Sequence, residues 1–295
     1  MKHEAPISRR GMLKTVAAVA ASGALRRSEA WASATRQGVS GNGPRTLALI
    51  GDRWHNPDYI RVSLDRVFKD LNLPIDYTTN HYDLSPSLLQ PYQLFVCLRD
   101  NMIWPGGYGA DRIEELENPG EFPAEKEEYW ITEEQGRAVK DFVAAGNGFY
   151  SLHNNAFVSR SSKQYREVQG GLALSHPPLR PFKVRIVNKD HPVTQGVEDF
   201  MVTDEQHYLI YDKDPKNILL QSENVDGLTF TTESEDTDLL GPPKNMGTTT
   251  ASGWAHEYGK GRVVFTAMGH TIHAMWQPEY LKLQKNAVRW LLRMS

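Results

Sequence analysis

Three histidines each follow a short apolar run that is typical of a buried β-strand. They are His55, His153 and His270. The strands are predicted at Thr46–Ile50, Phe149–Leu152 and Arg262–Met268. In an open α/β sheet, ligands bind beyond the carboxyl ends of the strands. We therefore expect the three imidazoles to converge at one edge of the sheet, although they are far apart in the chain.

Neutral imidazoles and a carboxylate are ordinary zinc ligands. Asp204 and Glu205 are the carboxylate candidates. The residues predict a site for a divalent metal such as zinc, formed by His55, His153 and His270, and no nucleotide cofactor. Because the sequence has no His-x-x-x-His pair, this prediction depends on convergence in the fold. For each histidine taken alone, a structural role in a loop is the alternative.

Aromatic and amide side chains near these histidines are candidates for substrate binding. They are Trp54, Asn154, Asn155, Trp104, Tyr108 and Trp276. Trp and Tyr combine a flat apolar face with a polar edge, which suits a sugar ring. Two of them lie in the long irregular stretch 99–130, and such loops are usually functional or disordered. A surface flap is the alternative for that stretch, and a packed surface aromatic is the alternative for Trp276.

The elements that must position these side chains alternate between strands and helices. A further buried strand is predicted at Leu94–Leu98, and amphipathic helices are predicted from Pro57 and over Pro278–Leu292. Gly259-Lys260-Gly261 separates two strands and is typical of a β-hairpin turn. We predict a single α/β domain over residues 45–295, with a mainly parallel central sheet, flanking helices and a β-hairpin near the C-terminus.

The first 44 residues differ from the rest of the chain. Arg9-Arg10 precede an apolar run and an Ala-x-Ala site ending at Ala34, in the order of a twin-arginine signal peptide. The apolar run is too short to span a membrane. We therefore predict a signal peptide at 1–34, a flexible leader at 35–44, export to the periplasm, and no membrane span after cleavage.

Charge and cysteine content exclude several classes of function. The formal charge of the whole chain is 33 − 36 = −3, and removal of six basic and two acidic residues in 1–34 gives 27 − 34 = −7. A mildly acidic protein without a basic face is not expected to bind nucleic acid. Cys97 is the single cysteine, so the chain can form neither an internal disulfide nor a cysteine zinc cluster.

Six short motifs carry a family resemblance through their order and spacing. They are Gly148-Phe149-Tyr150-Ser151-Leu152-His153, Gly170-Gly171 with Ser175-His176-Pro177-Pro178, His191-Pro192-Val193-Thr194-Gln195-Gly196, Asp204-Glu205, His256-Glu257-Tyr258-Gly259-Lys260-Gly261-Arg262, and Gly269-His270. Together they resemble the ThuA-like, or trehalose utilisation, family. The resemblance implies a flavodoxin-like fold similar to class I glutamine amidotransferases. Those enzymes place a cysteine at the sharp turn where this chain has His153, so their thiol chemistry is not expected here.

The resemblance also implies a carbohydrate-processing function on sugars that a partner dehydrogenase has oxidised to 3-keto forms. We expect metal-assisted cleavage of a 3-keto-glycoside by elimination and hydration, with Glu205, His153 and Asp204 as catalytic residues. The alternative is a non-catalytic periplasmic sugar-binding or accessory protein. A small-molecule carbohydrate is the expected partner, and a homo-oligomer is left open.

Overall fold

The computed structural model describes residues 43–105, 126–232 and 244–294. The predicted signal peptide at 1–34, most of the leader at 35–44, and Tyr108 lie outside the described residues and stay predictions. Among the described helices, none is long and apolar enough to cross a membrane.

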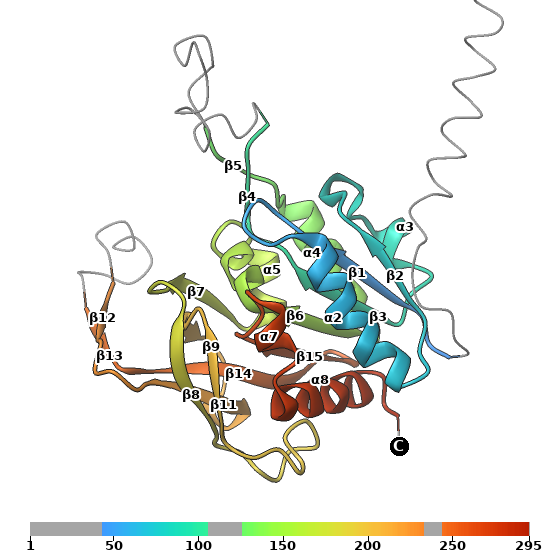
Figure 1. Cartoon of the computed structure of the whole chain (residues 1–295). Helices are drawn as coiled ribbons and strands as arrows, with labels where there is room; N and C mark the ends of the chain where they lie inside the picture. The colour runs from blue at the N-terminus through green and yellow to red at the C-terminus, as the bar shows by residue number, and fades with distance from the viewer. Residues whose placement is uncertain (1–42, 106–125, 233–243, 295) are drawn as a thin grey trace, which may run out of the picture. The chain divides into compact units, whose positions relative to one another are not determined.

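A nine-stranded sheet forms the centre of the described part of the chain (Figure 1). In spatial order its strands are β2 (Ile75–Thr78), β1 (Thr46–Ile50), β3 (Leu94–Leu98), β6 (Gly148–Leu152), β15 (Gly261–Thr266), β14 (Thr249–Tyr258), β11 (Ile218–Asn224), β8 (Arg180–Ile186) and β9 (Phe200–Asp204). The first five strands pair in parallel, in the 2-1-3-4-5 order of flavodoxin-like folds. The other four continue the sheet in antiparallel pairing.

Helices cover both faces of the parallel half (Figure 1). On one face lie α2 (Pro57–Asp70) and α8 (Pro278–Leu291), and on the other lie α3 (Pro86–Leu89), α4 (Glu133–Ala144) and α5 (Lys163–Gln169). Side chains of β1 alternate between these two cores: Ala48 and Ile50 join the first, whereas Leu47 and Leu49 join the second. Burial on both faces explains why β1, β3 and β6 are continuously apolar.

Local sequence signals set the helix boundaries near the site. The Asn56 side chain accepts a hydrogen bond from the backbone N–H of Asp58, and Pro57 occupies the first turn of α2. Thr132 and Gln135 form a reciprocal capping box at the start of α4. The start of α2 agrees with the helix predicted from Pro57.

Shorter elements surround the sheet. The two-stranded pairs are β7 (Gly171–Ser175) with β10 (Tyr208–Tyr211), β12 (Phe230–Thr231) with β13 (Asn245–Gly247), and β4 (Met102–Ile103) with β5 (Glu128–Tyr129). The short helices are η1 (His81–Asp83), η4 (His153–Arg160), η5 (Pro215–Asn217) and α7 (Ile272–Met275).

The α/β class, the parallel core and the β14–β15 hairpin agree with the sequence predictions. The antiparallel region is larger than the single hairpin expected, because β11, β8 and β9 extend the same sheet.

Candidate metal centre

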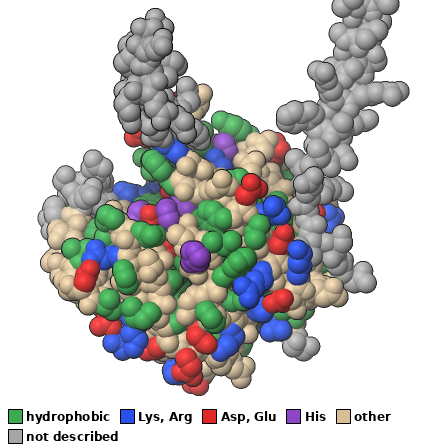
Figure 2. Space-filling model, in the orientation of Figure 1, with side chains coloured by type: hydrophobic (Ala, Val, Ile, Leu, Met, Phe, Trp, Pro, Cys, Tyr) green, Lys and Arg blue, Asp and Glu red, His purple; other side chains and the backbone are tan. Residues whose placement is uncertain are grey.

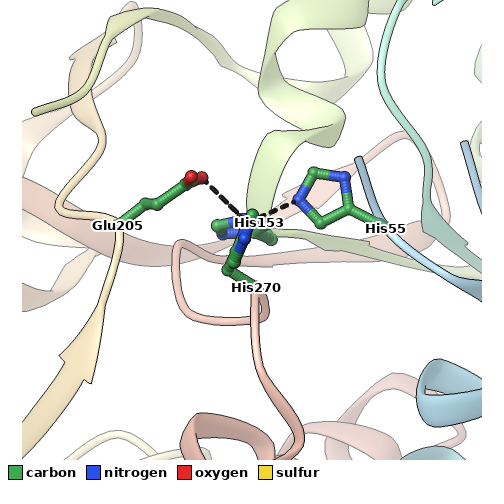
Figure 3. Close-up of side chains that lie close together, drawn as sticks. All are labelled: His55, His153, Glu205 and His270. Carbon is green, nitrogen blue, oxygen red and sulfur yellow. Dashed lines mark hydrogen bonds and ion pairs between the residues drawn. The ribbon is translucent and has the colours of Figure 1, made fainter. Parts of the chain in front are cut away.

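Four side chains from four different loops meet at one end of the sheet (Figure 3). His55 follows β1, His153 follows β6, His270 follows β15, and Glu205 follows β9. Their ligand atoms all lie within 4.8 Å of one another. The convergence of the three histidines with Glu205, which the sequence could only suggest, is therefore present in the structure.

Three separations between these atoms are close to those of a tetrahedral metal site. The Oε2 atom of Glu205 lies 3.4 Å from His153 Nε2 and 3.2 Å from His270 Nδ1, and His270 Nδ1 lies 3.1 Å from His55 Nε2. Zinc bonds of about 2.0–2.1 Å at tetrahedral angles place neighbouring ligand atoms about 3.3 Å apart. The donor set of three imidazoles and one carboxylate therefore fits a divalent cation, with zinc the first candidate.

Buried hydrogen bonds orient two of the imidazoles toward this point. The Nδ1 of His55 lies 2.8 Å from Asp52 Oδ1, so its N–H donates there and Nε2 keeps a lone pair for a cation. His153 Nδ1 donates in the same way to the backbone carbonyl of Ala267 at 2.7 Å. The Nε2 of His153 is buried and has no hydrogen-bond partner. Such outer contacts fix the tautomer of metal-binding histidines.

Asp204 connects the β9 loop to the β15 loop. Its carboxylate accepts the backbone N–H groups of Gly269 at 2.7 Å, His270 at 3.1 Å and Glu205 at 2.9 Å. These contacts bring the last strand of the antiparallel half back to the carboxyl end of β15. With its oxygens engaged by three backbone donors and its side chain away from the cavity lining, Asp204 positions Glu205 and His270. Asp204, which the sequence offered as a catalytic residue, therefore lies where it holds the loops that carry Glu205 and His270.

His153 has an unusual backbone conformation. Its φ of 53° lies in the left-handed region, which non-glycine residues rarely adopt. The turn directs its ring from the end of β6 toward the cluster, while Gly269 passes close behind it. A Cβ atom on Gly269 would lie 2.7 Å from the Cβ of His153, so only glycine fits there. Strain of this kind is commonly found at functional sites.

The pKa shifts in the cluster favour an ionised Glu205 carboxylate that faces the imidazoles. Burial raises the pKa of the Glu205 carboxyl, but the facing imidazoles of His153, His207 and His270 outweigh it and lower the pKa far below its usual range. Burial lowers the pKa of His55, which stays neutral. Burial also lowers the pKa of His153, but Glu205 and Asp204 reverse the effect and raise it. A divalent cation at this point would compensate the charge of Glu205 and bind the imidazoles in their neutral form.

A cavity of about 370 Å³ opens beside the cluster. It is lined by Trp54, His55, Asp100, Met102, Asn154, Phe157, His176, Glu205 and His270. Figure 2 shows histidine side chains reaching the visible surface next to an acidic side chain. The volume lies near the lower end of the range for small-molecule sites, about 300–1,000 Å³. The arrangement is therefore suited to a small ligand in direct reach of the candidate metal.

Of the predicted substrate-binding residues that the structure describes, some line the cavity and others lie outside its lining. Trp54 and Asn154 line the cavity, and the Trp104 ring packs edge-on against Trp54 with ring centroids 5.8 Å apart. Asn155 points away from the cavity, toward Cys97 and Tyr165, with which it forms buried hydrogen bonds. Trp276 is outside the cavity lining and packs against the core beneath Arg66. Asn155 and Trp276, which were expected to bind substrate, are thus both outside the cavity lining.

Three site residues were missed or assigned a lesser role by the sequence. Asp100 follows β3 just as His55 follows β1, so the same signal of a strand followed by a polar residue would have found it. His176 and His207 were not among the ligand candidates taken from the sequence. In the structure their Nε2 atoms lie 3.6 and 3.5 Å from Glu205 Oε2.

Comparisons with known proteins agree with the fold. A family model described as ThuA, trehalose utilisation, matches residues 62–291. The structure of a ThuA-like protein from Bacteroides uniformis ATCC 8492 has 17% identity and a TM-score of 0.54, covering 86% of this chain and 94% of that one. The structure of a ThuA-like protein from Parabacteroides merdae ATCC 43184 has 15% identity and a TM-score of 0.56, covering 85% of this chain and 90% of that one.

A β-galactosidase from Rahnella sp. R3 is also similar, with 12% identity and a TM-score of 0.51 over 87% of this chain but 32% of the galactosidase. At these identities the structural likeness concerns the fold alone. No curated protein matches the chain.

Proposed function

Because the chain belongs to the ThuA, or trehalose utilisation, family, we propose that it cleaves a 3-keto-glycoside by metal-assisted elimination followed by hydration. Membership of the family implies a carbohydrate-related role. The observation that carries the more specific proposal is the cluster of His55, His153, His270 and Glu205 at the wall of a cavity for a small ligand.

The proposed reaction uses the ketone to weaken a neighbouring bond. A carbonyl at C3 of the sugar acidifies the proton on C2. A base removes this proton, the C2–H electrons form a double bond to C1, and the C1–O bond breaks with protonation of the departing oxygen. Addition of water across the resulting enone then places OH on C1 and H on C2, so that the net reaction is hydrolysis of the glycoside.

The cluster and the cavity divide these tasks. A bound divalent cation would supply Lewis acidity to the C3 carbonyl. Glu205 is poorly suited to be the base, because its low pKa makes it a weak proton acceptor. Asp100 lines the same cavity, and burial together with the nearby Asp52 charge raises its pKa to about 7. A base with a pKa near the working pH is the most effective, so we assign the proton transfer to Asp100.

Trp54 offers a binding face for the sugar. Its side chain lines the cavity and is 49% exposed, which is unusual for a tryptophan. The Arg53 guanidinium lies 4.5 Å from the ring centroids of both Trp54 and Trp104 and holds them in place. An exposed but fixed aromatic ring at the cavity rim supports recognition of a sugar.

The proposed setting of this reaction follows from the N-terminal sequence and the substrate. A twin-arginine signal would export the folded protein to the periplasm with its metal already bound. A sugar dehydrogenase would supply the 3-keto substrate, because the proposed cleavage itself includes no oxidation step.

Incubation of the zinc-loaded protein with 3-keto-trehalose tests the proposal. We expect release of glucose, loss of activity with a chelator, and incorporation of deuterium at C2 when the reaction is run in D₂O. Asp100→Asn should lower kcat by at least about 100-fold, as general base catalysis contributes about 10²–10⁴-fold. For the wild type, kcat/KM should rise with pH up to about 7, since Asp100 must be ionised.

Asp141→Asn is a matched control, because Asp141 is an exposed residue of α4. Saccharide binding by calorimetry without any turnover of the folded, zinc-loaded protein would refute the enzyme and favour an accessory sugar-binding protein. Full activity of Asp100→Asn would refute only the assignment of the base.

A further inference from the structure

We propose that the centre binds two divalent cations, and that His176, His207 and Glu205 form the second site, with Glu205 shared between the two. The stoichiometry stands on the geometry alone, whereas the catalytic use of the second cation rests on the proposed function.

The geometry of the second group matches that of the first. The Nε2 atoms of His176 and His207 lie 3.6 and 3.5 Å from Glu205 Oε2, and the three ligand atoms lie within 4.8 Å of one another. These separations are longer than an ordinary hydrogen bond of about 2.7–3.2 Å. They are close to the distance of about 3.3 Å that is expected between two ligand atoms of a tetrahedral zinc ion. Two imidazoles and a carboxylate leave an open coordination position, as in catalytic zinc sites.

His207 provides an independent indication of a missing partner. Its side chain is fully buried, and neither ring nitrogen has a hydrogen-bond partner. A buried polar group without a partner destabilises the folded state, so such groups in native proteins call for an explanation. A cation between His207, His176 and Glu205 would satisfy the Nε2 atom.

A separate structural element delivers the two histidines. The strands β7 and β10 pair antiparallel with Ser175 opposite Tyr208. The adjoining residues His176 and His207 therefore lie at the same end of this ribbon, with ring centroids 4.7 Å apart. The histidines of the first site follow strands of the large sheet, whereas His176 and His207 adjoin the two-stranded ribbon of β7 and β10.

The charges around the cavity favour more than one cation. The carboxylates of Asp52, Asp100, Asp204 and Glu205 all lie in or directly behind the cluster, and the described residues that line the cavity include neither lysine nor arginine. Pairs of metal ions about 3.5–4 Å apart, held by shared ligands, are common in hydrolytic centres. A second cation would give the hydration half of the proposed reaction its own Lewis acid.

Metal stoichiometry is the direct test. Chelator-treated full-length protein is titrated with Zn²⁺ by calorimetry, and the bound zinc is measured by elemental analysis after dialysis. We expect two equivalents for the wild type and one for the His176→Gln/His207→Gln double variant. His273→Gln is the matched control, because His273 is exposed on α7 and outside the cavity lining, and it should keep two equivalents.

Two further measurements test the second site even if the double variant does not fold. His176→Gln alone changes a partly exposed side chain and should weaken the second equivalent by at least about 10-fold even if the double variant does not fold. Protein loaded with Mn²⁺ should give the electron paramagnetic resonance spectrum of a coupled pair. One equivalent of zinc in the folded wild type, unchanged by His176→Gln, would overturn the inference. Two equivalents without turnover of 3-keto-trehalose would support it and refute the proposed function.

Discussion

Replacement of Asp52 by asparagine tests the hydrogen bonds behind the candidate metal centre without changing any of its candidate ligands. Asp52 is not among the residues that line the cavity, and its side chain is only 1% exposed. Its Oδ1 accepts N–H groups of His55 and Trp54, and its Oδ2 accepts the backbone N–H of Asp100 at 2.8 Å and the amide of Asn154 at 2.9 Å. An asparagine in either orientation must place its own NH₂ group against at least two of these donors.

The expected magnitudes follow from these contacts. Loss of the acceptor behind a metal-binding histidine usually lowers metal affinity by about 10–100-fold, or about 1.4–2.8 kcal/mol. Burial raises the pKa of Asp52, but the His55 and Asn154 contacts outweigh it and lower the pKa to about 2. A decrease of this size from the ordinary value corresponds to about 2 kcal/mol of stability. That contribution is present above about pH 4 and is lost as the pH falls through about 2.

The assay measures zinc affinity by competition with a chromophoric chelator, and stability by urea unfolding of metal-free protein at pH 7. Asp52→Asn should bind zinc at least about 10-fold more weakly and unfold with about 2 kcal/mol less free energy. Asp141→Asn, the exposed control on α4, should change neither quantity. Zinc affinity of a folded Asp52→Asn protein within twofold of the wild type would show that Asp52 does not orient His55 for a metal.

Three further predictions concern the same core. Gly269→Ala should destabilise the protein by about 1–3 kcal/mol and weaken zinc binding, because the new Cβ would clash with the Cβ of His153. An unchanged melting temperature and zinc affinity would contradict this prediction. Burial lowers the pKa of His256 to about 4, so the native state holds a neutral ring while the unfolded chain takes up a proton. Urea unfolding should therefore show about 3 kcal/mol of stability lost between about pH 6.5 and 4, and His256→Gln should flatten that slope. Burial raises the pKa of Cys97 to about 12, so thiol reagents at pH 8 should label it only after unfolding; rapid labelling of the native protein would disprove its burial.

Local pattern in the sequence was sufficient for the parallel half of the fold. Apolar runs that end in polar residues located β1, β3 and β6, and they placed His55 and His153 at the correct edge. The same reasoning correctly placed His270 after β15. These predictions succeed because parallel strands share one direction, so the residue that follows each strand lies at the same end of the sheet.

Contacts that depend on long-range geometry could not be predicted in this way. Glu205 reaches the cluster only because the antiparallel half of the sheet returns its last strand to the β15 loop, where Asp204 fixes it. His176 and His207 meet through the register of β7 with β10, which their separation in sequence does not reveal. Registers of this kind are set by packing against the rest of the fold.

Neighbouring residues can also be separated by local geometry. Asn154 and Asn155 looked equivalent in the sequence, but they lie in the 3₁₀ helix η4, where successive side chains point about 120° apart. Asn154 therefore faces the cavity, while Asn155 turns into the core beside Cys97. The sequence predicted a polar turn after β6 but not the helix type that divides its side chains between the site and the core.

The features that oppose folding in this protein are concentrated at the cluster. His153 adopts a left-handed backbone conformation, His207 is buried without a hydrogen-bond partner, and Asp204 and Glu205 bring two adjacent carboxylates into the interior. Each of these features lowers the stability of the fold, and such features are uncommon outside functional sites. A divalent cation would relieve the last two at once, because it would bind the free imidazole nitrogens and compensate the negative charge. The sharp turn that presents a cysteine in amidotransferase-like folds would then serve here to present a metal ligand.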